Sequence, residues 1–312
     1  MLEPDAGELS SGSPADGVPL ALPLSVYADA IELHEPFGRS VRGETPRREL
    51  LKATGQWLLR DAGLEERLLP SADEDQRTLI KRLLTLRPAR PIPPDMLQVL
   101  DRLFADDASR RTVVTLSDVL EGRSAPRRAG ATDVQLWRGD ITTLEVDAIV
   151  NAANADMLGC FRPEHRCIDN AIHSAAGPRL REDCHRIMCR QGHREPTGTA
   201  KATRAYYLPS KFVLHTVGPI VGAGAVTANH RRLLASCYAS CLAAAAEIGV
   251  RSLAFCAVST GVFGYPKDDA AAEAIRSVTT WLEGHADRLD AVIFNVFGEQ
   301  DEDAYRRVGA WR

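Results

Sequence analysis

The stretch Asp147-Ala148-Ile149-Val150-Asn151-Ala152-Ala153-Asn154 places two asparagines directly after a short apolar run. A run of this length and composition is typical of a buried β-strand, so the asparagines are expected at the carboxyl end of that strand. Their side chains have two interpretations there. The amides cap the turn through bonds to their own backbone, or they bind the hydroxyl groups of a sugar.

Similar apolar runs lie on both sides of this stretch. They are Val134–Trp137, Phe212–Thr216, Leu253–Val258 and Ala291–Val296, and helical stretches fill the gaps, notably Asn229–Ile248 and Lys267–Glu283. Buried strands that alternate with helices predict a layered α/β/α unit.

The sequence changes character toward the N-terminus. Residues 1–17 are rich in Gly, Ser, Pro, Asp and Glu, which predicts a disordered leader. Residues 18–125 show apolar residues at helical spacing, interrupted by prolines, and predict a small all-helical domain that contributes no catalytic group. A connection rich in Gly, Ser, Pro and Arg follows, and the α/β unit is expected to occupy residues 131–312.

Charge and cysteine content exclude several classes of protein. Lys and Arg total 38 against 42 Asp and Glu, a net charge of −4, so no global field favours nucleic acid or membrane as a partner. The N-terminus lacks a basic segment before an apolar run, and no apolar stretch is long enough to span a bilayer, so we expect a cytoplasmic protein. Seven cysteines without an export signal predict reduced thiols, most of them in the core.

Two further loops follow predicted strands, at the edge of the sheet where α/β units bind ligands. Gly139-Asp140-Ile141-Thr142 presents a carboxylate, although Gly-Asp is also an ordinary turn. The loop Ser259–Pro266 contains two glycines and leads into a helix, an arrangement that suits a phosphate, with Phe263 and Tyr265 placed to flank a ribose. The alternative interpretation is a plain Gly-Pro connection.

Together these segments resemble the macrodomain family over residues of about 131–312. The resemblance rests on Gly139–Thr142, Asp147–Asn154, Asp169–Gly177, His215–Pro219 and Ser259–Pro266. It implies a three-layer fold with a mixed, largely parallel sheet and a cleft for ADP-ribose. In that cleft Asp140 would bind the adenine amine, Ile141 the adenine edge and Asn154 the distal ribose. The pyrophosphate would lie on the backbone of Ser259, Thr260, Gly261, Val262, Phe263, Gly264 and Tyr265.

The sequence departs from the family where many macrodomains have a run of glycines. Here the loop has the pattern Cys-x4-His-x-Cys, formed by Cys160, His165 and Cys167. Two thiolates and an imidazole within eight residues are a good ligand set for one Zn²⁺ per chain, and three protein ligands leave a fourth position open, as in catalytic zinc sites. The pattern resembles the zinc-containing macrodomain subfamily.

Asp169 and His173 stand four residues apart at the start of a predicted helix, so their side chains share one face. Asp169 is interpreted either as a helix cap or as part of the ribose and water network, and His173 either as a packed supporting residue or as a catalytic one. With Asn154 they are the candidate catalytic residues. His185, His193, His215 and His230 lack comparable neighbours in sequence and are expected to be structural or exposed.

The resemblance implies hydrolysis of mono-ADP-ribose from modified protein side chains, often modified by a sirtuin-like transferase. An ester to Asp or Glu suits zinc assistance, because the departing carboxylate develops a charge that the metal accepts. Two alternatives stay open: an ADP-ribose-binding module in which zinc is structural, and an O-acetyl-ADP-ribose deacetylase.

Overall fold

A central sheet organises the chain. The computed structural model describes residues 20–38, 45–121 and 127–309, so the predicted leader lies outside the described residues. The sheet has seven strands in the order β2 (Arg127–Ala129), β3 (Thr132–Arg138), β9 (Ala291–Val296), β8 (Ser252–Phe255), β5 (Ala148–Ala153), β7 (Phe212–Val217) and β6 (Ala200–Arg204). The edge strands β2 and β6 pair antiparallel and all the strands between them pair parallel. The predicted mixed, largely parallel sheet is confirmed.

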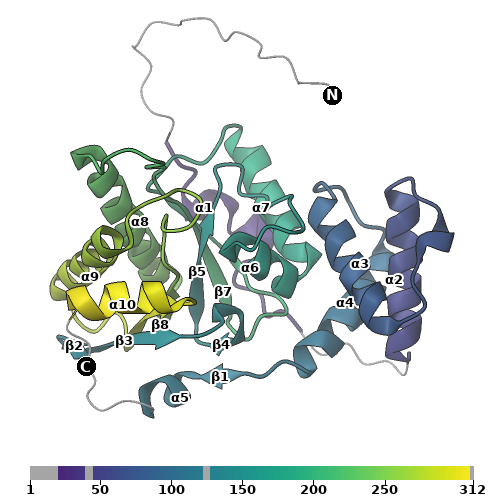
Figure 1. Ribbon diagram of the computed structural model, residues 1–312, viewed down its shortest axis with the longest axis horizontal. Coiled ribbons are helices and arrows are strands. Elements are labelled where there is room, and N and C mark those ends of the chain that lie inside the picture. The colour runs from purple at the N-terminus through teal and green to yellow at the C-terminus, as the bar shows by residue number, and fades with distance from the viewer. Residues whose placement is uncertain (1–19, 39–44, 122–126, 310–312) are drawn as a thin grey trace, which may run out of the picture.

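Helices cover both faces of this sheet (Figure 1). One face carries α8 (Ala228–Glu247), α9 (Lys267–Gly284) and α10 (Glu299–Gly309), and the other carries α6 (Ile168–Ala176) and α7 (Pro178–Gln191). The strands are apolar on both sides because both sides are covered: every residue of β9 is buried. The three-layer α/β/α architecture is therefore as predicted.

The starts of α7 and α8 follow from their sequences. Pro178 occupies the first turn of α7, where its missing N–H costs nothing. The side chain of Thr227 accepts a bond from the backbone N–H of His230 (3.2 Å) and caps α8.

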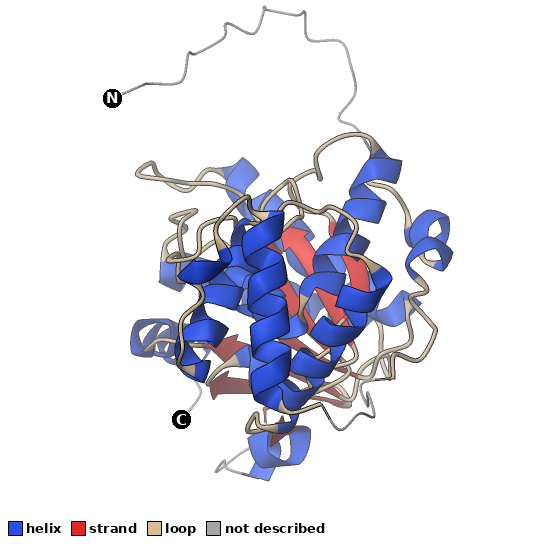
Figure 2. Cartoon of the chain, turned by 90° about the vertical axis from the view of Figure 1, so that its right-hand side faces the viewer, coloured by secondary structure: helices blue, strands red, loops and turns tan. Residues whose placement is uncertain are grey.

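The helical part of the chain forms a second, smaller core. Figure 2 views the molecule from this side, with helices in front of the strands of the sheet. It consists of α2 (Arg47–Asp61), η2 (Glu66–Leu68), α3 (Asp73–Leu86) and α4 (Pro94–Ser109). A short parallel pair, β1 (Val114–Thr115) with β4 (Leu144–Glu145), then leads through α5 (Leu116–Glu121) toward the main sheet.

Residues 18–125, predicted as one helical domain, contribute to two different cores. The segment of α1 (Leu24–Tyr27) and η1 (Asp29–Ile31) buries Tyr27 and Ile31 in the core of the main sheet. The hydroxyl of Tyr27 accepts a hydrogen bond from the backbone N–H of Ala202 in β6 (2.8 Å). This N-terminal segment thus packs in the core of the α/β unit, a core that also includes Leu100 and Phe104 of α4.

Strand β6 was not among the predicted runs, because its sequence Ala-Lys-Ala-Thr-Arg resembles an exposed segment. In the structure Lys201 is completely buried and its ammonium group is paired with Glu195 at 2.9 Å. A buried charge needs such a partner, which lies outside the strand and is invisible to a local pattern. Among the described residues, no helix is long and apolar enough to cross a membrane.

Candidate active site

A cleft of about 430 Å³ lies at the carboxyl ends of β5, β8 and β9. Two of the three predicted loops, 147–154 and 259–266, meet there together with the loop of Cys160, His165 and Cys167, whereas the loop Gly139–Thr142 lies beside the cleft. Of the predicted site residues, the cleft is lined by Asn154, Cys160, His165, Cys167, Asp169, Ser259, Thr260, Gly261, Val262 and Phe263. The topology explains this convergence, since parallel strands all present their carboxyl ends at one edge of the sheet.

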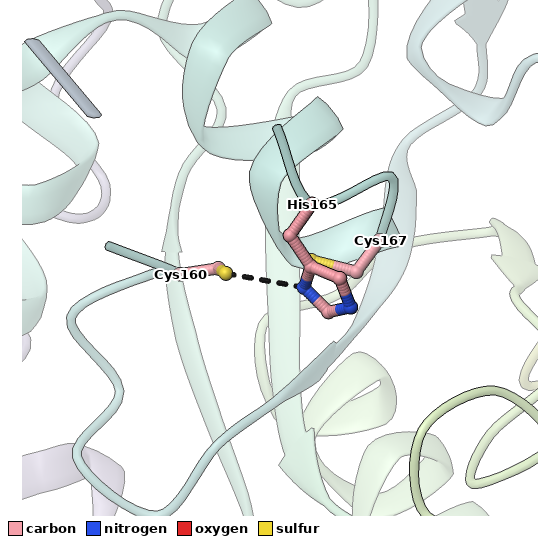
Figure 3. Close-up of side chains that lie close together, drawn as sticks. All are labelled: Cys160, His165 and Cys167. Carbon is pink, nitrogen blue, oxygen red and sulfur yellow. Dashed lines mark hydrogen bonds between the residues drawn. The ribbon is translucent and has the colours of Figure 1, made fainter. Parts of the chain in front are cut away.

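The three predicted metal ligands lie together (Figure 3). The Sγ atom of Cys160 is 3.3 Å from Nδ1 of His165, and the ligand atoms of Cys160, His165 and Cys167 all lie within 4.8 Å of one another. All three residues are half-buried, and within the described chain no fourth His, Cys, Asp or Glu joins them. Two thiols and an imidazole at this separation fit a tetrahedral Zn²⁺ with one position left for another ligand.

Burial is the main cause that raises the pKa of the Cys167 thiol to about 11; the neighbouring Cys160 and Asp169 contribute, and the bond from the N–H of Asn170 opposes the rise. A thiol with such a pKa is neutral in the absence of a cation, and binding of a metal would deprotonate it. The same sulfur accepts a weak bond from the backbone N–H of Asn170 (3.4 Å) at the start of α6, which fixes its direction.

Asp169 is held between the two asparagines of the 147–154 stretch. Nδ2 of Asn151 donates to Oδ1 of Asp169 at 2.8 Å, and Nδ2 of Asn154 lies 3.4 Å from Oδ2. Asn154 also donates to the carbonyl of Gly159 at 3.0 Å, the residue before Cys160. Burial raises the pKa of Asp169 to about 6, and the bond from Asn151 and the positive charge of Arg181 oppose this effect. One carboxylate is thus oriented toward the cleft, beside the thiols and imidazole.

His173 lies behind the loop 160–167, which carries the three predicted metal ligands and is called the metal-ligand loop below. It is not among the residues that line the cleft. Its Nε2 is 3.5 Å from Oδ1 of Asp169, and neither ring nitrogen has a hydrogen-bond partner among the described residues. Burial, and then the proximity of His215, lower the pKa of His173 well below its usual value, so the ring is neutral. This geometry favours the interpretation of His173 as a packed supporting residue over a catalytic one.

His215 has partners that the sequence did not reveal. Its Nδ1 lies 3.1 Å from Nδ2 of Asn151, an obligatory donor, so Nδ1 accepts and the proton resides on Nε2, which donates to Thr203 at 2.9 Å. His173, Cys184 and His215 also form a buried group of ligand-type atoms. Because Nε2 of His215 carries a proton, it offers no lone pair, and this second group does not fit a metal.

The loop Ser259–Pro266 turns sharply at the far side of the cleft. Ser259 has a φ of 65°, and its carbonyl accepts from the backbone N–H of Tyr265 at 3.0 Å. In the described chain the backbone N–H groups of residues 260–263 donate to no protein acceptor. These free amides at the cleft wall are suited to an anion. Gly264 and the buried Tyr265 lie outside the lining, behind the turn.

The predicted adenine-binding residues lie next to the cleft and do not line it. Oδ1 of Asp140 accepts from the backbone N–H (2.9 Å) and the hydroxyl (2.8 Å) of Thr142, so the carboxylate caps its own turn. Ile141 is buried. The neighbouring wall of the cleft is formed by Asn295 and the exposed Phe297, and Asn295 donates to the carbonyl of Gly139 at 2.9 Å. Sequence reasoning missed this pair, and the signal was a polar residue within the apolar run Ala291–Val296.

Comparisons with known proteins agree with this site. The family model described as "Macro domain" matches residues 150–274. A protein from Treponema medium named protein-ADP-ribose hydrolase is 45% identical over 242 residues, which cover 77% of this chain and 90% of that protein. A protein of the same name from Staphylococcus aureus strain MSSA476 is 40% identical and covers 82% of this chain and 94% of its own length.

Solved structures show the same similarity. A Trypanosoma brucei macrodomain in complex with ADP-ribose has a TM-score of 0.56 and 32% identity, and the match covers 72% of this chain and 94% of that one. A macrodomain from Oceanobacillus iheyensis has a TM-score of 0.55 and 33% identity, over 60% of this chain and 95% of that one.

Proposed function

Because this chain belongs to the macrodomain family, we propose that it is a hydrolase that removes ADP-ribose from modified proteins, and that it uses one zinc ion. The observation that carries the proposal is that Asn154, Asp169 and the group Cys160, His165 and Cys167 line one cleft. A binding module needs the cleft alone. A carboxylate and a metal-ligand set at the same end of it are additional groups that hydrolysis at the ribose could use.

The cleft offers a distinct surface for each part of ADP-ribose. The free amides of residues 260–263 suit the pyrophosphate, and Asn154 suits the hydroxyl groups of the distal ribose. The adenine then lies toward Asn295 and Phe297, next to the Asp140 turn. The distal ribose thereby faces the metal-ligand loop, where its anomeric carbon carries the protein side chain.

The chain's own residues would orient the sugar for cleavage at that carbon. The transition state resembles an oxocarbenium ion, so a negative carboxylate nearby is favourable, and Asp169 is held in place for this by Asn151 and Asn154. A zinc ion bound by Cys160, His165 and Cys167 would supply Lewis acidity toward the departing oxygen or toward water. We propose an ester to Asp or Glu as the linkage, made by a sirtuin-like transferase, because a carboxylate is a good leaving group.

The experiment is metal analysis of the purified protein together with release of ADP-ribose from an automodified protein substrate. The expected result is one zinc per chain and release that stops on chelation and returns when zinc is restored. Binding of ADP-ribose without release in the zinc-loaded protein would establish a non-catalytic module instead. Faster turnover of O-acetyl-ADP-ribose than of the modified protein would indicate a deacetylase.

A further inference from the structure

Arg181 of α7 joins parts of the chain that are distant in sequence. Its side chain is nearly buried, and Nη1 donates to the backbone carbonyls of Leu84 (2.7 Å) and Arg87 (2.6 Å). These carbonyls end α3, where a helix leaves acceptors without partners and its dipole is negative. Arg181 therefore caps the helical part of the chain from outside it.

The same guanidinium group contacts the metal-ligand loop. Its carbon lies 4.7 Å from the ring centroid of Phe161, which directly follows Cys160. A guanidinium packed on an aromatic face is attracted to it, and more strongly when water is excluded. Arg181 thus bonds the end of α3 and also packs against the loop.

The loop is also held from α6. Nδ2 of Asn170 donates to the carbonyls of Arg162 (2.7 Å) and His165 (3.0 Å). An ion pair between Arg82 of α3 and Glu164 of the loop is exposed to solvent, where such pairs contribute little. Arg181 itself is nearly buried, although the ring of Phe161 is partly exposed, so its contact with the loop is better shielded from water than the Arg82–Glu164 pair.

We propose that Arg181 is a positioning residue through which the end of α3 fixes the loop of Cys160, His165 and Cys167 over the cleft. Its effect on hydrolysis rests on the function proposed above, whereas its effect on the loop does not. The helical part of the chain then acts on the site through a buried side chain without lending it a reactive group. A lysine at this position would fill the role only in part. An ammonium group lacks the planar guanidinium that bonds two carbonyls and stacks on a ring.

Arg179 provides a matched control on the same helix. Its guanidinium forms a fork with Asp101 of α4 (2.8 and 2.6 Å), so it also ties α7 to the helical part of the chain. The bonds found for it leave the metal-ligand loop untouched. The guanidinium carbon of Arg179 also lies 5.7 Å from the ring centroid of Phe37 in the N-terminal segment. Loss of Arg179 therefore tests how α7 packs on α4 and on this segment, and loss of Arg181 tests docking and the loop together.

The experiment measures hydrogen exchange of residues 160–167 in the full chain, with zinc release to a chelator as a second readout. Arg181→Met is expected to accelerate both by about fivefold, the size of a cation–aromatic contact with a partly exposed ring. Arg181→Lys should fall between this variant and the wild type. Arg179→Met should lose comparable global stability and leave loop exchange close to wild type.

Phe161→Leu separates the loop contact from the cap. It removes the ring and leaves the bonds to Leu84 and Arg87, so loop exchange should rise while global stability stays near wild type. Equal loop exchange in Arg181→Met and Arg179→Met, or wild-type exchange in Phe161→Leu, would overturn the proposal. Absence of ADP-ribose release by the wild type would reject the proposed function alone, because exchange is measured without substrate.

Discussion

The imidazole of His173 packs directly against Gly159. A Cβ atom built at Gly159 would lie 3.0 Å from Cγ of the ring, and the glycine has a φ of 83°. Both the backbone conformation and the close approach require glycine at the residue that precedes Cys160. The position of the metal-ligand loop therefore depends on a contact with a histidine that does not line the cleft.

Gly159→Ala is expected to displace this loop. Strain at a positive φ costs about 1–3 kcal/mol, and the methyl group must in addition push the ring or the loop away. Denaturant unfolding and zinc content per chain measure the two effects. Gly249→Ala is the control, because Gly249 has a φ of 73° and nothing within 4 Å of the added carbon. If both variants retain full zinc, the loop does not depend on His173.

Cys160→Ser and Cys167→Ser are expected to lower hydrolysis by orders of magnitude while changing the free energy of unfolding far less. Both thiols belong to the cleft, and a hydroxyl is a poor zinc ligand. Rates of ADP-ribose release, metal content and thermal melting are the measurements. Cys189→Ser, an exposed cysteine of α7, should match the wild type in all three. Wild-type rates in zinc-free cysteine variants would exclude a catalytic metal and leave the fold unaffected.

Asp140→Ala is expected to weaken ADP-ribose binding by about 1.5–3 kcal/mol, the value of a hydrogen bond to a charged group. The carboxylate also caps its own turn through Thr142, so part of the loss would come from the backbone. Thr142→Val removes the hydroxyl bond and keeps the carboxylate and the backbone bond, so it measures how much loosening of the turn alone weakens binding. Calorimetry gives both affinities, and an unchanged affinity in Asp140→Ala would reject the adenine contact.

His215 makes the fold sensitive to acid. Burial lowers its pKa to about 3, whereas an unfolded chain binds the proton near pH 6.5. The unfolded state therefore holds more protons between these values, and the free energy of unfolding falls as the pH drops from about 6.5 toward 3, by at most ~1.4 kcal/mol per pH unit from this group. Denaturant unfolding at several pH values should show a shallower slope for His215→Gln. His34→Gln, at an exposed position, should keep the wild-type slope, and equal slopes in all three proteins would contradict the assignment.

Most of the fold could be predicted because its signals are local. The strands β3, β5, β7 and β9 are largely buried, so each carries a short, mostly apolar run. Strand β6 was not predicted, because the charge of its Lys201 is neutralised by Glu195, a residue outside the strand.

The site residues also differ in how well the sequence predicts them. Cys160, His165 and Cys167 were recognised because they are close in sequence, and the structure places them together. His215 and Arg181 were missed because their partners, Asn151 and the end of α3, come from distant parts of the chain. Spacing along the sequence carries no information about such contacts.

The short spacing of Cys160, His165 and Cys167 along the sequence affects how strongly a bound metal would stabilise the fold. Residues 160–167 contain all three ligands, so a denatured chain keeps them within a short loop whose closure costs little entropy. An ion that binds native and denatured chains alike shifts the equilibrium between them only by the difference in affinity. A zinc ion bound by these residues would therefore raise the melting temperature only slightly even if its affinity were high, and during synthesis the nascent segment could bind the ion before the sheet around it has formed.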